Sequence, residues 1–367
     1  MIIFAENPAC MRYSVIVPVY NRPEEVEELL ESLAVQTFRD FEILVVEDGS
    51  DRPCRAVVEA FRDRVDVHYF VKPNSGPGPS RNYGAERASG QWLIILDSDV
   101  IVPPGYFDAL EKELADRPCQ AFGGPDRAHE SFSPVQKAIS YAMTSFFTTG
   151  GIRGGCRKLD QFYPRSFNMG IRRDVYAALG GFSRMRFGED IDFSLRIVKA
   201  GYRCRLFPEA WVWHKRRTDL KKFFRQVHNS GIARINLYKK HPDSLKPVHV
   251  LPALFTVGMT FCLLLFLAGI FLSMVQPRPV VAFGLSGAVV PLPAILGALG
   301  VLPPLFFSLF ILVDSTVRTR SLQVGLLSVP AAFVQLTGYG SGFLRAWWAR
   351  CILGRGEMEA FRKNFYK

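Results

Sequence analysis

Three long runs without a charged residue dominate the C-terminal third of the sequence, at 250–275, 280–313 and 321–344. A bilayer-spanning helix needs about 20 predominantly apolar residues, so the first and third runs each predict one span. The middle run is longer and contains four prolines, which interrupt helices. It therefore predicts a bent span, a span with a re-entrant piece, or two short spans. We predict three spans within 249–345, with four as the alternative.

Positive charge is concentrated just before these runs. The chain has a formal net charge of +11, and residues 199–246 alone hold 13 Lys and Arg against three acidic residues, a net charge of +10. Because apolar residues are interleaved with these cations, residues 219–248 predict an amphipathic helix along anionic lipid headgroups. Nucleic-acid binding is the alternative for such a run, but its position beside a span argues against it. We therefore expect membrane lipids, and no nucleic acid, as partners. The tail at 346–367 is also basic.

The N-terminal extension, residues 1–11, lacks the basic start and long apolar core of a secretory signal. The soluble portion that follows is therefore expected to stay in the cytoplasm, because the basic segment before the first span favours that side. This predicts an integral protein of a bacterial-type inner or plasma membrane. The seven cysteines show no C-x-x-C spacing, so we expect reduced thiols without a disulfide or zinc role.

The soluble part alternates between short apolar runs and amphipathic segments. The runs at 13–19, 42–46, 65–70 and 91–96 are predicted strands, with predicted helices between them. This alternation predicts an α/β fold with a Rossmann-like, mostly parallel sheet covered by helices. In such sheets, ligands bind beyond the carboxyl ends of the strands.

Acidic residues directly follow two of these strands, as Glu47-Asp48 and as Asp97-Ser98-Asp99. Two carboxylates on a rigid support suit a hard divalent cation such as Mg²⁺ or Mn²⁺, which also binds substrate phosphates. For an isolated D-x-D, a solvated turn is the alternative. The turn after the first strand has no G-x-G-x-x-G, and no G-x-x-x-x-G-K-[ST] occurs. These absences argue against the dinucleotide-binding dehydrogenases and the P-loop enzymes.

Five sequence blocks stand out in the soluble part: VIVPVYNRPEEVEELLESL, VVEDGSDR, NSGPGPSRNYGAERASGQWLIILDSDV, FNMGIRRDVYAALGGF and FGEDIDFSLRIVKAGYRCRLFPEAWVWH. In their order and spacing, these blocks resemble those of the family 2 glycosyltransferases. The resemblance covers about residues 12–240. It implies a GT-A fold at 12–218 and inverting transfer of a sugar from a nucleotide-diphosphate donor. One departure is Glu47-Asp48, because the family usually has two aspartates there.

The resemblance also implies roles on the donor side. The loop after the first strand and the acidic pair after the second would contact the nucleotide, and the R-N pair would support the donor pocket. The implied donor-binding residues are Pro18, Tyr20, Asn21, Glu47, Asp48, Arg81, Asn82, Asp97 and Ser98.

The resemblance implies a cation site at Asp97, Asp99 and His214 and a catalytic base at Asp190. Inversion needs a carboxylate that removes the proton of the acceptor hydroxyl, whereas the leaving diphosphate needs a cation. The alternatives are a half-buried histidine among aromatic residues for His214 and a helix cap for Asp190. The implied acceptor-side or supporting residues are Asn168, Gly170 and Glu189.

Together these features predict a membrane-bound inverting glycosyltransferase. It would move a sugar from a nucleotide-diphosphate sugar to a lipid-linked saccharide acceptor, in the assembly of a cell-surface polysaccharide or glycan. Transfer to polyprenyl phosphate is the alternative within this class. A non-catalytic sugar-nucleotide-binding or transport protein is the alternative from another class, and the intact carboxylate set argues against it. The Gly-rich stretch at 149–157 is either a mobile lid or a connector.

Overall fold

The computed structural model describes residues 11–127, 132–150, 162–185, 187–215, 217–275, 281–283 and 289–357. The chain divides into two compact units. The first comprises Met1–Ser131, Gly155–Lys215 and Glu357–Lys367, and the second comprises Phe132–Gly154 and Arg216–Gly356. Residues 132–154 therefore belong to the second unit, although the sequence-based division included them in the catalytic domain. Most of the predicted lid or connector, from 151 to 157, lies outside the described residues.

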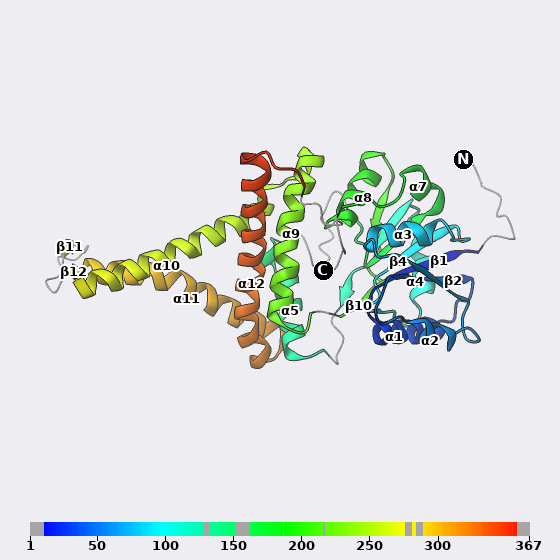
Figure 1. The fold of residues 1–367 in the computed structure, drawn as a ribbon. Coiled ribbons are helices and arrows are strands. Elements are labelled where there is room, and N and C mark those ends of the chain that lie inside the picture. Colours follow the sequence, from blue (N-terminus) through cyan, green and yellow to red (C-terminus); the bar gives the residue numbers. More distant parts are fainter. Residues whose placement is uncertain are drawn as a thin grey trace. The chain divides into compact units, whose positions relative to one another are not determined.

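A seven-stranded, mostly parallel sheet forms the centre of the first unit, as the sequence predicts (Figure 1). Its strands are β1 (Tyr13–Val19), β2 (Phe41–Asp48), β3 (Val67–Lys72), β4 (Trp92–Leu96), β6 (Ala121–Gly123), β8 (Asn168–Arg172) and β9 (Cys204–Leu206). The strand order is β3-β2-β1-β4-β8-β6-β9. Strands β1 to β4 run parallel, whereas β8 runs antiparallel to both of its neighbours.

Helices cover both faces of this sheet. They are α1 (Pro23–Ala34), α2 (Arg55–Glu59), α3 (Pro77–Ala85), α4 (Tyr106–Asp116), α7 (Arg173–Ala178) and α8 (Glu189–Lys199). Successive side chains of a strand point to opposite faces, so Val15 and Val17 of β1 pack in a cluster with α1 and α4, whereas Ile16 packs in a cluster with α7 and α8. Burial on both faces explains why the strands are apolar at nearly every position.

A second, three-stranded sheet joins segments that are far apart in the sequence. Its order is β5 (Val100–Ile101), β10 (Val212–His214) and β7 (Asp126–Arg127). Strand β10 runs antiparallel to β5 and pairs His214 with Val100. Because Val100 directly follows Asp99, this pairing brings His214 to the end of β4.

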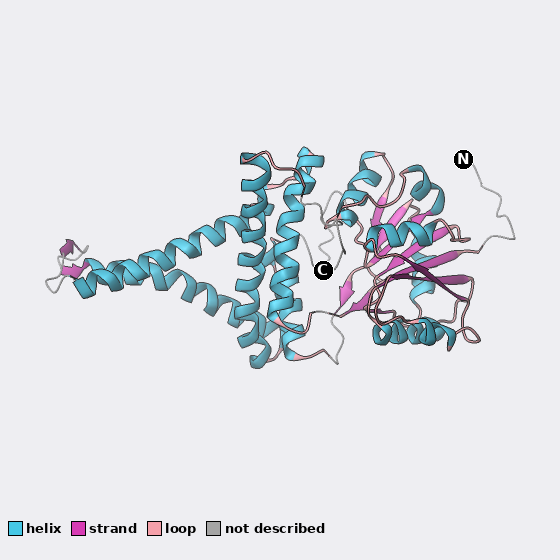
Figure 2. Ribbon diagram, viewed as in Figure 1, coloured by secondary structure: helices cyan, strands magenta, loops and turns pink. Residues whose placement is uncertain are grey.

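The second unit is helical (Figure 2). Its elements are α5 (Pro134–Thr144), α6 (Phe146–Thr149), α9 (Leu220–Lys240), η1 (Pro242–Ser244), η2 (Pro247–His249), α10 (Leu251–Val275), β11 (Val281–Phe283), β12 (Val289–Pro291), α11 (Leu292–Thr319), α12 (Leu322–Trp347) and η3 (Trp348–Ile352). Three stretches are long and apolar enough to cross a membrane, at Pro247–Val275, Leu292–Thr319 and Leu322–Ile352.

The middle apolar run differs from the prediction. Its first residues include β11 and β12, which pair antiparallel, and the helix α11 begins only at Leu292. The expectation that prolines interrupt this run was wrong for two of them, because α11 continues through Pro303 and Pro304. Neighbouring helices and side chains make such prolines tolerable in apolar helices.

Candidate functional site

The predicted cation ligands lie together where β4 ends. Asp97, Asp99 and His214 place one potential ligand atom each within 4.8 Å of one another. The Nε2 of His214 is 3.2 Å from Oδ1 of Asp99. Ser98, between the two aspartates, is buried. The structure thus brings together three residues that are up to 117 positions apart in the sequence.

This ligand set fits a hard divalent cation, because two carboxylates and one imidazole nitrogen are ligands that Mg²⁺ and Mn²⁺ accept. The ring of His214 stacks on Phe167, with ring centres 5.1 Å apart. Its buried Nδ1 has no hydrogen-bond partner among the described residues. Asp99 also forms an ion pair, in which its Oδ2 contacts the Arg22 guanidinium.

Arg81 connects this group to a second acidic site. Its guanidinium donates to Oδ1 of Asp97 and to Oε1 of Glu189, both at 2.9 Å. The side chain is 3% exposed and lies over the ring of Phe182. Burial lowers the pKa of this guanidinium, but Asp97 and Glu189 outweigh that effect and raise the pKa above its ordinary value. Arg81 is therefore a permanent cation between the two sites.

Glu189 and Asp190 lie in the first turn of α8. The N-cap is Gly188, with a left-handed φ of 85°, so Asp190 is not the residue that caps the helix. Oδ2 of Asp190 accepts a hydrogen bond of 2.7 Å from Nε of Arg165, and its Oδ1 accepts one of 2.9 Å from the Ile191 N–H. The carboxylate therefore keeps acceptor capacity for a further hydroxyl.

The two neighbouring carboxyls have pKa values shifted in opposite directions. Burial raises the pKa of both groups. For Asp190, the positive charges of Arg165 and Arg81 outweigh burial and hold the pKa below its ordinary range. For Glu189, burial prevails over Arg81, and the negative charge of Asp190 adds to it, so the pKa is raised. Of the two carboxyls, Asp190 therefore holds its proton more weakly.

Asp48 holds the Gly-rich loop that leads into α3. It accepts hydrogen bonds from the N–H groups of Ser75 (2.9 Å) and Gly76 (2.7 Å) and from Nζ of Lys72 (2.6 Å). The carboxylate is 1% exposed. In the described structure, this predicted nucleotide-binding residue therefore fixes the shape of a loop at the carboxyl end of the sheet.

Glu47 is joined to the loop after β1 through one hydroxyl. Ser50 donates to Glu47 and accepts a hydrogen bond of 2.8 Å from the N–H of Asn21, whose φ of 56° is left-handed. The other Glu47 oxygen accepts from the Cys54 N–H at 2.8 Å and from the Tyr69 hydroxyl at 3.0 Å. Pro18 and Tyr20 are the other residues predicted to bind the donor near the end of β1. Both are half-buried.

Asn82 holds the turn before α8. Its Oδ1 accepts from the Tyr176 hydroxyl (2.6 Å) and from the Phe182 N–H (2.8 Å), and its Nδ2 donates to the Phe182 carbonyl (2.9 Å). Phe182 packs against the Arg81 guanidinium. Asn82 therefore helps to position Arg81 indirectly, by holding Phe182 in place.

The two predicted supporting residues of β8 are packed in the interior. Asn168 is fully buried, accepts a hydrogen bond of 2.6 Å from the Tyr106 hydroxyl and donates one of 2.8 Å to the Ala210 carbonyl. A Cβ at Gly170 would overlap the ring of Phe122. Both residues therefore position the strands that carry the site.

Sequence reasoning missed three cations that contact the predicted carboxylates. Arg22 contacts Asp99, Arg165 contacts Asp190, and Lys72 contacts Asp48. Of the three, only Arg22 could have been suspected from the local sequence, because it follows Asn21 in a loop that was predicted to bind the donor. The other two come from segments without a recognisable motif.

Comparisons with known proteins identify relatives of the first unit. Residues 14–180 match the sequence model of the family described as Glycosyl transferase family 2. An uncharacterized glycosyltransferase of Rickettsia felis is 32% identical over 137 residues, which are 37% of this chain and 22% of the relative. The pre-mycofactocin glycosyltransferase of Mycobacterium tuberculosis is 29% identical over 247 residues, which are 66% of this chain and 51% of the relative. The chain thus spans about a fifth of the length of the first of these curated relatives and about half of the length of the second.

One solved structure has a similar fold across most of the chain. It is the mannosyltransferase PcManGT from Pyrobaculum calidifontis, in complex with GDP-Man and Mn²⁺. The TM-score is 0.57 at 17% sequence identity, and the match covers 88% of this chain and 86% of that chain. At this identity the likeness concerns the fold, and its coverage includes helices of the second unit.

Proposed function

We propose that the chain is a membrane-bound inverting glycosyltransferase, since residues 14–180 match the sequence model of glycosyl transferase family 2. Its donor is a nucleotide-diphosphate sugar, and its acceptor is a lipid-linked saccharide in cell-surface polysaccharide or glycan assembly. The observation that carries the proposal is the series of contacts from the Asp97–Asp99–His214 group through Arg81 to Glu189, which directly precedes Asp190. These contacts join a candidate cation site and a candidate base in one network.

The proposed reaction is a single displacement at the anomeric carbon. Asp97, Asp99 and His214 would hold a divalent cation, and its positive charge would stabilise the leaving nucleotide diphosphate. Asp190 takes the proton of the acceptor hydroxyl while the hydroxyl oxygen forms the new bond to the anomeric carbon. The bond to the diphosphate breaks on the opposite face, and the electron pair leaves with the diphosphate. The low pKa of Asp190, caused by Arg165 and Arg81, supports this role because the carboxylate is ionised at neutral pH.

We place the nucleotide against the loops that follow β1 and β2. Asn21 and Glu47 are linked by hydrogen bonds through Ser50, and Asp48 accepts a hydrogen bond from Gly76 in the loop before α3. These groups lie at the same edge of the sheet as Asp97. This arrangement suits a nucleotide whose diphosphate reaches the cation. The three apolar stretches of the second unit support a membrane location, and we place the catalytic unit on the cytoplasmic side, where nucleotide sugars are available.

The test begins with membranes that contain the full chain. Radiolabelled nucleotide sugars are supplied one at a time, and the lipid-extractable product identifies the donor. We expect Asp190→Asn to lower transfer by at least about 100-fold, the usual contribution of a general base, while donor binding is kept. Asp174→Asn, an exposed acid paired with Arg172, is the matched control and should retain full activity. Unchanged turnover in Asp190→Asn would show that the base is another residue.

A further inference from the structure

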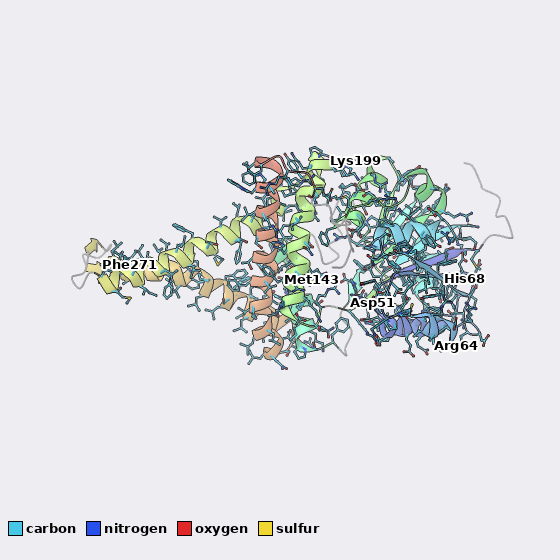
Figure 3. The ribbon with its side chains drawn as sticks, in the orientation of Figure 1. Asp51, Arg64, His68, Met143, Lys199 and Phe271 are labelled. Atoms are coloured by element: carbon cyan, nitrogen blue, oxygen red, sulfur yellow. The ribbon has the colours of Figure 1, made fainter. Side chains whose placement is uncertain are left out.

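The three long apolar helices of the second unit differ in what surrounds them. On α10 and α11, exposed large apolar side chains occur along most of each helix, from Leu251 to Val275 and from Leu299 to Val317. Figure 3 shows one of them, Phe271, near the far end of α10. On α12, exposed large apolar side chains lie only near the two ends, at Leu322, Leu326 and Trp347. The interior of α12 is packed mainly against other helices of the unit.

Helices α10 and α11 are in contact at their far ends. A Cβ at Gly269, in the last third of α10, would lie 2.8 Å from the Pro293 carbonyl oxygen at the start of α11. About two turns further along α11, a Cβ at Gly300 would lie 2.6 Å from the Cys262 carbonyl oxygen. The two helices therefore form an antiparallel hairpin that is tightly packed over its outer half.

The other ends of this hairpin rest on α12 at two separate places. The start of α10 contacts α12 at Gly340, where a Cβ would overlap the Pro252 carbonyl. The end of α11 contacts α12 at Gly325, where a Cβ would lie 3.1 Å from the Leu312 carbonyl oxygen. These glycines are 15 positions apart, roughly 22 Å along a helix. Helix α12 thus runs across the open base of the hairpin (Figures 1 and 2).

Helix α9 lies beside α12 and runs in the same direction. A Cβ at Gly338 would lie 2.5 Å from the Val227 side chain, and one at Gly342 would overlap the His228 carbonyl. The start of α9 is therefore level with the middle of α12. Lys221, Lys222 and Arg225, all exposed, lie at that start.

These cations argue against a transmembrane α12. If α12 crossed the bilayer, its middle would lie near the midplane, and Lys221, Lys222 and Arg225 of the attached α9 would lie there too. Charged side chains at that depth are rare and costly, and they face a polar cavity or a partner. Among the described residues, Lys222 forms an ion pair with Asp219 at 3.4 Å, and its side chain is 63% exposed.

We propose that α10 and α11 alone cross the membrane, as a two-helix hairpin, and that α12 lies with α9 at the level of the lipid headgroups. At 25 and 28 residues, α10 and α11 are each long enough for a hydrocarbon core of about 30 Å. The exposed aromatic side chains of Phe224, Trp347 and Trp348 suit this interfacial depth, and the cations of α9 suit anionic lipid headgroups.

This arrangement fixes the topology of the chain. Two crossings return the chain to the side on which it began, so the C-terminal segment lies on the same side as the catalytic unit. Three crossings would place it on the opposite side. The inference rests on membrane insertion and not on the chemistry proposed above, so its test does not depend on transfer activity.

The test uses the full chain in sealed vesicles and a maleimide that does not cross membranes. Single added cysteines are read peptide by peptide by mass spectrometry, so the native cysteines stay in place. Lys112→Cys, exposed on α4, reports the side of the catalytic unit and serves as the reference. The probes are Gln323→Cys at the start of α12, Arg355→Cys after η3, and Ser273→Cys at the end of α10.

In intact vesicles, we expect the labelled fractions of Gln323→Cys and Arg355→Cys to lie within about twofold of the labelled fraction of Lys112→Cys. Ser273→Cys should be labelled only after detergent opens the vesicles. Protection of Arg355→Cys together with labelling of Gln323→Cys would overturn the proposal, because α12 would then cross the bilayer. Labelling of Ser273→Cys in intact vesicles would overturn it as well, because the hairpin would not cross.

Discussion

We expect Arg81→Met to destabilise the first unit strongly. The guanidinium is 3% exposed and contacts the carboxylates of Asp97 and Glu189 at 2.9 Å each. Methionine fills a similar volume but leaves Glu189, whose side chain is 11% exposed, without its cation. Removing one partner of a buried ion pair costs about 3–5 kcal/mol. Asp97 adds less because its side chain is 30% exposed and keeps water contacts.

The assay is thermal unfolding of the full chain in detergent, followed by tryptophan fluorescence. A loss of 1 kcal/mol lowers Tm by about 2–4 °C for a unit of this size, so we expect a fall of roughly 6–20 °C. Adding Glu189→Gln to Arg81→Met should recover a large part of this fall, because no buried carboxylate is then left without a partner. Arg64→Met is the control, since the Arg64–Glu31 pair is about half exposed on both sides.

Two results would refute this reasoning. A Tm for Arg81→Met within about 2 °C of the parent would mean that the contacts contribute little to stability, as at an exposed pair. A further fall on adding Glu189→Gln would mean that the cost came from lost packing around Arg81 and not from an unpaired charge.

Three further predictions concern single contacts. Arg165→Gln removes the cation that lowers the pKa of Asp190, so the acid limb of the pH–rate profile should move to higher pH, because the base is then protonated earlier as pH falls. An unmoved limb would contradict this. Arg22→Gln removes a competing cation from Asp99 and should tighten Mn²⁺ binding, measured by electron paramagnetic resonance; weaker binding would contradict it. Gly170→Ala forces a methyl group into a buried aromatic ring and should cost about 1–3 kcal/mol, visible as a lower Tm.

The sheet and its acidic edge could be predicted from sequence because they depend on local pattern. Buried strands such as β1 and β4 are continuous apolar runs, and the carboxylates directly follow them. Parallel strands place such residues at one edge, so proximity of the two acidic clusters follows from strand direction alone. His214 is different. It reaches Asp99 through the pairing of β10 with β5, which no local pattern reveals, and the family resemblance supplied that assignment.

The features that sequence reasoning missed depend on contacts between distant segments. The α5 segment has the amphipathic pattern of any surface helix, but its buried Ala138 and Ile139 pack in a cluster with Val324 and Ala331 of α12. Nothing near residue 138 indicates that partner. In the same way, nothing in the three apolar runs indicates that α9 packs along α12, where Gly338 and Gly342 lie against Val227 and His228.

The measurement that tests the central claim most directly is the anomeric configuration of the transferred sugar. Membranes with the full chain are supplied with the donor, and the configuration of the product linkage is determined by NMR. A single displacement with Asp190 as base predicts a product inverted relative to the donor, formed by the parent and not by Asp190→Asn. A product with retained configuration, or equal amounts of product from both chains, would contradict the account.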